Sequence, residues 1–450
     1  MASLRFALVI FVPSLLACDG TPAVNEPAQC DVLTTYAGDV LIEGEDADAQ
    51  AAGFCADFNA VEGSFQVQGA SWNDLTPISC LCSVSEDFVL SSMGELSDLS
   101  GLNLQYVGRA VNLLNVDRIV DLAGLPSDLE AGGLEILGND ALVTTDPFRL
   151  PYWADHAVEV SQNPALTDLL AWSDVERVGR IYLDSPLVET LAGLNSLREI
   201  GGSAYFTDCG LRSLEGFDSL ESGYISLVGC PDLTSLSGLR QPAVLKGLVV
   251  GDAPKFRTPG ELPDGISIGT LALHDAALIS LAGLERATIT SQLQIGDCDL
   301  LTSLDGFPSQ AGTLDDVYLY DLPALASIEA LSGVEVVANE IKLRDLSSLD
   351  SLEGLHNVGS AGEVWLSDLN SLRDVDGLRG LRVVESGDGT GSGSFYLYSS
   401  DELVDLGGLH GIERVEGGMD ALGGNIPQSE CDALLEAIGE ENIGGLFRCS

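Results

Sequence analysis

The amino-acid sequence predicts a β-rich repeat solenoid of about 17 coils, closed by a cap at each end. A short pattern recurs about every 23–24 residues: apolar-x-apolar, then polar residues, then L-x-S-L-x-G-L or a close variant. Ile225-Ser226-Leu227, for example, is followed by the run Leu233 to Leu239. A single repeat this short cannot bury its apolar side alone, so neighbouring repeats must stack into one continuous core. The 45% of apolar residues supplies enough material for that core.

The predicted strand starts set the number of coils. They recur with a mean spacing of about 24 residues, and stacking at about 5 Å per coil gives a molecule about 80 Å long. The starts are Val40, Phe65, Phe88, Val111, Leu134, Val158, Ile181, Ala204, Ile225, Leu248, Leu271, Leu293, Val317, Ile341, Val364, Phe395 and Met419. The sequence therefore predicts one solenoid domain over residues 40–428.

The N-terminal residues carry the features of an export signal. Arg5 precedes an apolar run too short to span a membrane as a stable helix, and Leu-Leu-Ala-Cys ends at Cys18. This ending resembles the bacterial lipobox, in which the cysteine is acylated and becomes the mature N-terminus. Residues 1–17 are then a lipoprotein signal peptide, and residues 18–39 form a tether and the start of the N-terminal cap. An ordinary secretory signal that happens to end near a cysteine is the alternative.

Cysteines mark both ends of the predicted solenoid. Export permits disulfides, and we expect Cys30, Cys55, Cys80 and Cys82 to pair among themselves in the N-terminal cap. At the other end, the residues from Ser429 onward offer an S-x-x-D helix start, and Gly439 offers a stop. Residues 429–450 should thus form a helical cap closed by a disulfide between Cys431 and Cys449.

One position of the repeat is predicted to point inward behind each strand. Asn amides there can accept hydrogen bonds from buried turn N–H groups, whereas Cys, Ala and Leu fill volume. Cys209 and Cys230 lie on consecutive coils, about 5 Å apart, which leaves both a thiol pair and a disulfide open. The position is occupied by Asn139, Asn163, Cys209, Cys230, Ala253, Ala276, Cys298, Leu322, Leu346 and Leu369.

These repeats resemble leucine-rich repeats, whose L-x-L-x-x-[N/C] core turns Asn or Cys inward. The L-x-S-L-x-G-L tail and the spacing are most similar to the receptor L-domain repeats of bacterial surface lipoproteins. The resemblance covers roughly Val40 to Gly424. It implies a right-handed coil stack and a location in the bacterial envelope, at the outer membrane or cell surface. It does not imply a particular ligand, because this architecture serves many partners.

A column of aspartates occupies another position of the repeat. Stacked carboxylates about 5 Å apart repel one another unless something compensates their charge. Hydrogen bonds from turn N–H groups are one explanation, and a Ca²⁺-binding edge is the other. The column contains Asp252, Asp275, Asp297, Asp321, Asp345 and Asp368, with Asp208 two coils earlier.

Outward-facing strand positions are the candidate binding site. Alternate residues of a strand share a face, and late in the chain four consecutive coils place aromatic and basic residues on it. Aromatic and Arg side chains dominate interface hot spots, although aromatics also simply suit strands. The candidate residues are Tyr318, Tyr320, Lys342, Arg344, Trp365, Tyr396 and Tyr398, with a smaller pair, Tyr182 and Tyr205, on earlier coils. The two cations are expected to form a basic island, and the inserted segment Gly387–Ser394 lies nearby in the chain.

Composition narrows the classes of function. A formal charge of −49 repels phosphate backbones, so we expect no nucleic acid partner. The four histidines (His156, His274, His356, His410) fall at unrelated repeat positions, and no nucleophile-elbow, zincin or phosphate-loop motif occurs. We therefore expect no enzyme activity and no cofactor. The sequence favours a lipid-anchored recognition or adhesion protein that binds a protein or glycan; a passive acidic coat protein is the alternative.

Overall fold

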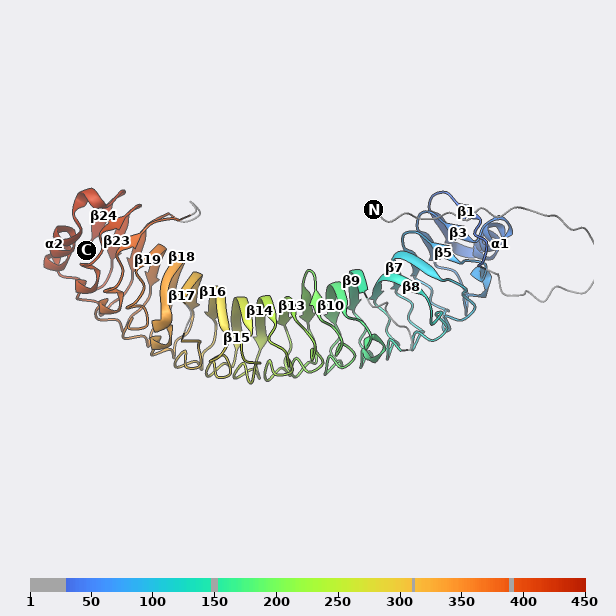
Figure 1. Cartoon of the computed structure of the whole chain (residues 1–450), viewed down its shortest axis with the longest axis horizontal. Helices are drawn as coiled ribbons and strands as arrows, with labels where there is room; N and C mark the ends of the chain where they lie inside the picture. The colour runs from blue at the N-terminus through green and yellow to red at the C-terminus, as the bar shows by residue number, and fades with distance from the viewer. Residues whose placement is uncertain (1–29, 147–152, 310–311, 388–391) are drawn as a thin grey trace, which may run out of the picture.

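The computed structural model describes residues 30–450 except 147–152, 310–311 and 388–391 (Figure 1). The predicted signal peptide and the predicted acylation site, Cys18, lie outside the described residues, as does the middle of the Gly387–Ser394 segment. The described chain forms a parallel β-solenoid that curves into an arc, with its sheet along the concave side (Figure 1). The predicted fold class is confirmed.

Each coil contributes one rung to the sheet. The principal strands are β2 (Val40–Glu43), β4 (Phe65–Gln68), β6 (Phe88–Ser91), β7 (Tyr106–Leu114), β8 (Glu130–Leu137), β9 (Trp153–Ser161), β10 (Arg177–Asp184), β12 (Ala204–Thr207), β13 (Ser222–Val228), β14 (Val244–Ala253), β15 (Ser267–Ala276), β16 (Thr288–Gly296), β17 (Gly312–Tyr320), β18 (Val334–Arg344), β19 (Ser360–Ser367), β21 (Phe395–Tyr398), β23 (Met419–Leu422) and β24 (Phe447–Cys449). Shorter strands precede some of them: β1 (Thr35–Tyr36), β3 (Ala60–Val61), β5 (Ser83–Val84), β11 (Glu199–Ile200), β20 (Val383–Val384) and β22 (Arg414–Val415).

All of the predicted strand starts lie in one row of the sheet. Val40 pairs with Phe65, Phe65 with Phe88, and the same register continues coil by coil to Met419. The 17 strand starts thus mark the ends of about 16 complete turns of the solenoid. One further rung, β24, was not predicted: its Phe447 pairs with Met419.

The core follows the two-residue alternation of the strands. The start of each rung and the residue two further on point inward, as Ile341 and Leu343 do at 0% exposure. The predicted inward position behind the strand is also buried. There Asn163 Oδ1 accepts a hydrogen bond from the Asn139 backbone N–H at 3.0 Å, and Asn139 Oδ1 accepts one from Val116 at 2.8 Å.

A helix that the sequence analysis missed covers the N-terminal end of the core. Helix α1 (Ala47–Asp57) lies in the first coil and buries Ala51 and Phe54. Its alanine-rich sequence was the available signal, because alanine has the highest helix propensity. The first coil therefore works as a cap that shields the otherwise open end of the solenoid.

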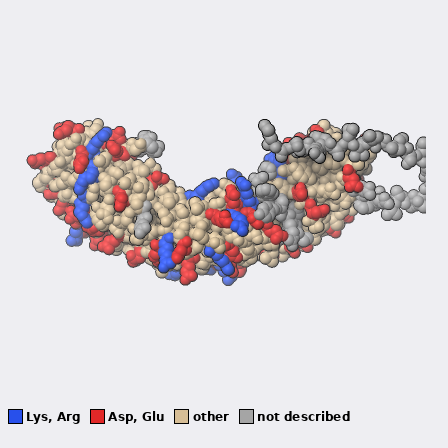
Figure 2. All heavy atoms as spheres, viewed as in Figure 1, with Lys and Arg blue, Asp and Glu red and all other residues tan. Residues whose placement is uncertain are grey.

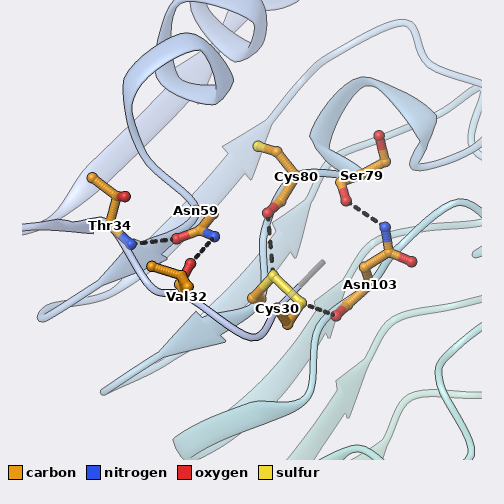
Figure 3. The surroundings of a disulfide bond; sticks show 8 residues. Cys30, Val32, Thr34, Asn59, Ser79, Cys80 and Asn103 are labelled. Carbon is orange, nitrogen blue, oxygen red and sulfur yellow. Dashed lines mark hydrogen bonds between the residues drawn. A yellow bond between two sulfur atoms is a disulfide. The ribbon is translucent and has the colours of Figure 1, made fainter. Parts of the chain in front are cut away.

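Two disulfides fasten this N-terminal cap. Cys30 bonds Cys82 and Cys55 bonds Cys80, so the four cysteines pair among themselves as expected. Figure 3 shows how the chain beside Cys30 is held: Asn59 accepts a hydrogen bond from Thr34 N–H at 2.7 Å and donates one to the Val32 carbonyl at 3.0 Å. The cap thus ties the chain from residue 30 onward to the first coils.

The C-terminal cap is helix α2 (Gln428–Ile438), and the predicted disulfide joins Cys431 to Cys449 on β24. Leu434 and Ile438 face the core, and Gly439 ends the helix with φ of 85°. The expected N-cap, Ser429, is wrong by two residues. Pro427 is the N-cap, in an extended conformation and without a side-chain cap hydrogen bond, and Ser429 lies within the first turn.

Of the three cysteines at the inward position, two form a disulfide and one is a free thiol. Cys209 and Cys230 form a disulfide with their Cα atoms 4.7 Å apart, which decides between the two possibilities left open by the sequence. Cys298 is a buried free thiol. Its pKa is raised to about 11 by burial, an effect that nearby aspartates strengthen, so the thiolate is strongly disfavoured.

Acidic side chains are spread along the arc, with fewer basic ones among them (Figure 2). Many of the basic residues pair with a carboxylate of a neighbouring coil, as Arg118 does with Glu95 at 2.6 Å. Such exposed pairs contribute little to stability. Among the described residues, no helix is both long and apolar enough to cross a membrane.

Candidate binding surface on the concave sheet

The predicted aromatic and basic residues come together on the concave side of the sheet. One outward row aligns Tyr318, Lys342, Trp365 and Tyr396 on successive rungs. A second row aligns Tyr320, Arg344, Ser367 and Tyr398. We call the seven aromatic and basic residues of these rows the aromatic surface. The structure thus places all seven on β17, β18, β19 and β21, next to one another.

The rings of the aromatic surface face outward as expected but are half-buried. They cover one another: the Trp365 ring centroid lies 4.9 Å from Tyr396 and 5.5 Å from Tyr398. The Tyr396 and Tyr398 rings stack at 5.9 Å. Mutual packing of this kind fixes the rings and leaves a continuous aromatic area facing the concave side.

The two cations do not form the expected basic island. Lys342 Nζ lies 5.5 Å from the Trp365 ring centroid and 3.7 Å from a Glu340 oxygen. Arg344 makes ion pairs with Asp321 at 2.6 Å and Asp345 at 3.0 Å. Glu340 and Asp345 on the same coil, and Asp321 on the preceding coil, thus compensate both charges.

A shallow groove of about 350 Å³ lies at one end of the aromatic surface, lined by Tyr318, Tyr320, Glu340, Lys342 and Arg344. The Tyr318 hydroxyl donates to Asp316 at 3.1 Å. Burial, together with the charges of Asp316 and Glu340, raises the pKa of Tyr318 well above its usual value, so the phenol stays protonated.

Two residues that the sequence analysis did not single out position Tyr320. A Cβ added to Gly296 would lie 2.1 Å from the Tyr320 ring, so the ring lies directly over this glycine of the preceding rung. Gln294 then donates to the Tyr320 hydroxyl at 3.2 Å. The available signal was the pairing of Gly with Tyr at one register position, where an aromatic ring covers a glycine.

At the opposite end of the aromatic surface lies a buried carboxylate, Asp420 on β23. Asp420, 3% exposed, accepts from the Tyr398 hydroxyl at 2.7 Å and from Arg448 Nε at 2.7 Å. Burial and the hydrogen bond to Asp420 raise the pKa of Tyr398 to about 12. Burial alone would raise the pKa of Asp420, but hydrogen bonds from Arg448 and Tyr398 outweigh it and lower that pKa. The sequence analysis missed this border because it did not predict β24.

The inserted segment returns to the sheet beside the aromatic surface. Ser392 donates to Glu363 through its backbone N–H at 2.9 Å and its hydroxyl at 2.6 Å. Glu363 lies two residues before Trp365 on β19. The end of the insertion is therefore attached to the same strand that carries the central ring.

The aspartate column has a backbone explanation. All seven aspartates adopt left-handed φ values between 45° and 59°, and other coils place Gly, Ser, Asn or Gln at the equivalent position. Among L-residues, Asp and Asn are the best suited to this conformation, which lets the chain turn away from the strand. The left-handed turn thus accounts for the aspartates whether or not an ion binds.

The aspartate column lines a trough of about 590 Å³ that includes Asp275, Asp297, Asp321, Asp345 and Asp368. Burial and then the neighbouring carboxylates raise the pKa of Asp297 and Asp345. Within the described residues, however, no group of three or more His, Cys, Asp or Glu side chains is arranged to hold a metal ion. The Ca²⁺ interpretation therefore gains no support from the geometry.

Comparison with known proteins gives distant similarity. Two sequences named Disease resistance protein RRS1, from Arabidopsis thaliana, are each 25% identical to this chain: one over 232 residues (50% of this chain, 15% of the relative), the other over 264 residues (55% and 18%). The chain thus spans less than a fifth of the length of these relatives. No family model and no solved structure matches it. The similarity and the solenoid together are consistent with a leucine-rich-repeat-like fold.

Proposed function

We propose that this protein is a recognition protein whose aromatic surface binds a protein or glycan ligand. The observation that carries the proposal is the gathering of five aromatic rings on four consecutive rungs of the concave sheet. Aromatic side chains supply large contact areas at low entropic cost, and they dominate binding energies. The distant similarity to a disease resistance protein supports a recognition role.

A binding comparison tests this role. Glycan and protein preparations are captured on the immobilised protein and on a Trp365→Ala/Tyr396→Ala variant. Loss of a hot-spot residue should weaken binding by about 2 kcal/mol, or roughly 30-fold. Tyr205→Ala is the matched control, because Tyr205 occupies the same outward row on β12. Equal binding by the wild type and the double variant would exclude the aromatic surface as the site.

We also propose that the protein is exported and anchored in the bacterial envelope through Cys18. The leader and lipobox-like ending support this, and four disulfides fit an oxidising compartment. In a Cys18→Ser variant, acylation should be absent and the protein should leave the detergent phase. Retention of the variant with lipid would contradict anchoring at this residue.

The alternative is a passive acidic coat, favoured by the net charge of −49. A coat of this kind needs no specific ligand, because charge alone keeps it soluble and repels other acidic surfaces. Under this alternative the double variant and the Tyr205→Ala control would behave identically in every binding experiment.

A further inference from the structure

We propose that the ligand of the aromatic surface is a neutral saccharide chain. In this arrangement the C–H faces of its sugar rings lie on Trp365 and Tyr396, and its hydroxyls reach the polar groups of the adjoining groove. This inference rests on the proposed recognition function and narrows it to one class of ligand. Charge, ring packing and hydrogen-bonding capacity carry it.

Charge excludes an anionic ligand. Lys342 and Arg344 are already paired with carboxylates, as described above. A further row of acidic residues, Asp316, Glu340 and Glu363, runs directly beside the aromatic surface in register. An anion that approached the rings would meet this row inside a molecule of net charge −49, and would need to displace an existing ion pair.

Ring packing disfavours a cationic ligand. Aromatic side chains bind cations most tightly where several rings form an open cage. The rings of Trp365, Tyr396 and Tyr398 pack against one another, with centroids 4.9–5.9 Å apart, and leave no cage between them. Lys342 Nζ already lies 5.5 Å from the Trp365 ring centroid, and Arg344 lies 5.9 Å from the Tyr320 ring centroid. A second cation beside these rings would therefore meet two like charges.

A neutral polyhydroxylated ligand fits what remains. The negative face of an aromatic ring attracts the polarised C–H bonds of a sugar face. Next to the rings, Glu340 lines the groove and can accept hydrogen bonds from hydroxyls, while Tyr318 and Tyr320 hold their hydroxyls in defined orientations. Apolar area beside a few fixed polar groups is the usual composition of a small-molecule site. A chain of sugars, rather than one, matches a surface that extends over four rungs.

The test measures binding of three probes by calorimetry: neutral oligosaccharides of glucose, mannose, galactose or N-acetylglucosamine, a uronic-acid oligosaccharide, and a basic peptide. At least one neutral oligosaccharide should bind, with an affinity that barely changes between low and high salt, because no counterions are released. Trp365→Ala should weaken this binding about tenfold or more, whereas Trp365→Phe should retain most of it. Tyr205→Ala should have no effect.

Two further variants separate stacking from hydrogen bonding. Glu340→Gln should weaken saccharide binding a few-fold, because the amide is a weaker hydrogen-bond acceptor than the carboxylate. The fold should stay intact, because the amide keeps the shape of the side chain. Gly296→Ala should displace the Tyr320 ring and weaken binding without touching the ligand.

The outcomes distinguish this inference from the function on which it rests. Salt-sensitive binding of the uronic-acid probe or the basic peptide, or a protein ligand lost in the Trp365→Ala/Tyr396→Ala variant, would overturn the saccharide while leaving recognition standing. If no probe binds, and every captured ligand binds the wild type and the double variant equally well, both proposals fail.

Discussion

Two stretches of the concave sheet share one backbone ladder and differ in the side chains on their outward face. In the N-terminal stretch, one outward row aligns Glu135, Glu159, Tyr182 and Tyr205 on four successive rungs. The corresponding row in the C-terminal stretch is Tyr318, Lys342, Trp365 and Tyr396. The inward residues of both stretches are apolar and buried. The coil therefore sets where side chains stand, and the outward residues alone decide what each stretch can bind.

The outward rows of the two stretches differ in their charges. Burial, and then the charges of Glu159 and Asp87, raise the pKa of Glu135, so like charges oppose each other across neighbouring rungs. In the C-terminal stretch, Lys342 and Arg344 separate the carboxylates and pair with them. The difference teaches that one backbone ladder can carry opposing carboxylates in one stretch and paired charges in another.

The largest expected effect is the loss of stability when an inward leucine is removed, and it tests whether the same strand positions face the core in both stretches. Leu183→Ala and Leu366→Ala should each lower the free energy of unfolding by about 2–5 kcal/mol, because both inward leucines are buried. Trp365→Ala should cost only about 1 kcal/mol, the value of its ring contacts. Chemical denaturation measures all three. A Trp365→Ala loss as large as that of Leu366→Ala would place Trp365 in the core and remove the aromatic surface.

The disulfide at the end of the N-terminal stretch, which joins the coil of Tyr205 to the next coil, should contribute about 3 kcal/mol, given a sequence separation of 21 residues. Replacing both Cys209 and Cys230 by Ala should show this loss in denaturation midpoints, whereas Cys298→Ala should change stability by about 1 kcal/mol or less. Peptide mapping without reduction should find Cys209 linked to Cys230 and Cys298 as a free thiol. A link between Cys298 and either partner would contradict the register of these coils.

The buried carboxylate at the C-terminal border comes next. Asp420→Asn should destabilise the protein by about 1–2 kcal/mol, because it removes charge-assisted hydrogen bonds from Tyr398 and Arg448. The effect stays modest because the Arg448 side chain is 57% exposed and water screens its charge. Because the pKa of Asp420 is lowered by folding, its contribution is present above the ordinary value of 3.8 and is lost as the pH falls through the folded pKa. The difference in melting temperature between wild type and variant should therefore shrink in strong acid. An equal difference at every pH would show that Asp420 acts through packing alone.

The smallest effect has the opposite sign. Glu135→Gln should stabilise the protein by about 0.2–1 kcal/mol at neutral pH, because it removes one of two like charges on adjacent rungs. Folding raises the pKa of Glu135, so the destabilisation develops as the pH rises above the ordinary value of 4.5 and is absent below it. Melting curves at acid and neutral pH measure this, with the exposed Glu436→Gln on α2 as the control. A stability loss on Glu135→Gln would mean that this carboxylate has a compensating partner.

The sequence by itself determined the coil stack, its register and its candidate face. Period-two alternation allows one set of residues, such as Ile341 and Leu343, to face the core, and a slip of one residue would bury Lys342 instead. That constraint repeats in every coil, which explains why each predicted strand start lies in one row. Cys431 and Cys449 were equally predictable, because they bracket a short segment at the end of the repeats.

Only the tertiary structure decided how side chains from different coils meet. Four N-terminal cysteines allow three pairings, and the folded cap realises the one that joins Cys30 to Cys82 and Cys55 to Cys80. The repeat pattern places Arg344 on the outer face, yet Asp321 of the preceding coil reaches it only because the rungs stack at one spacing. Local periodicity specifies where a side chain points, whereas the charge and shape of a surface depend on distances between coils that no single repeat contains.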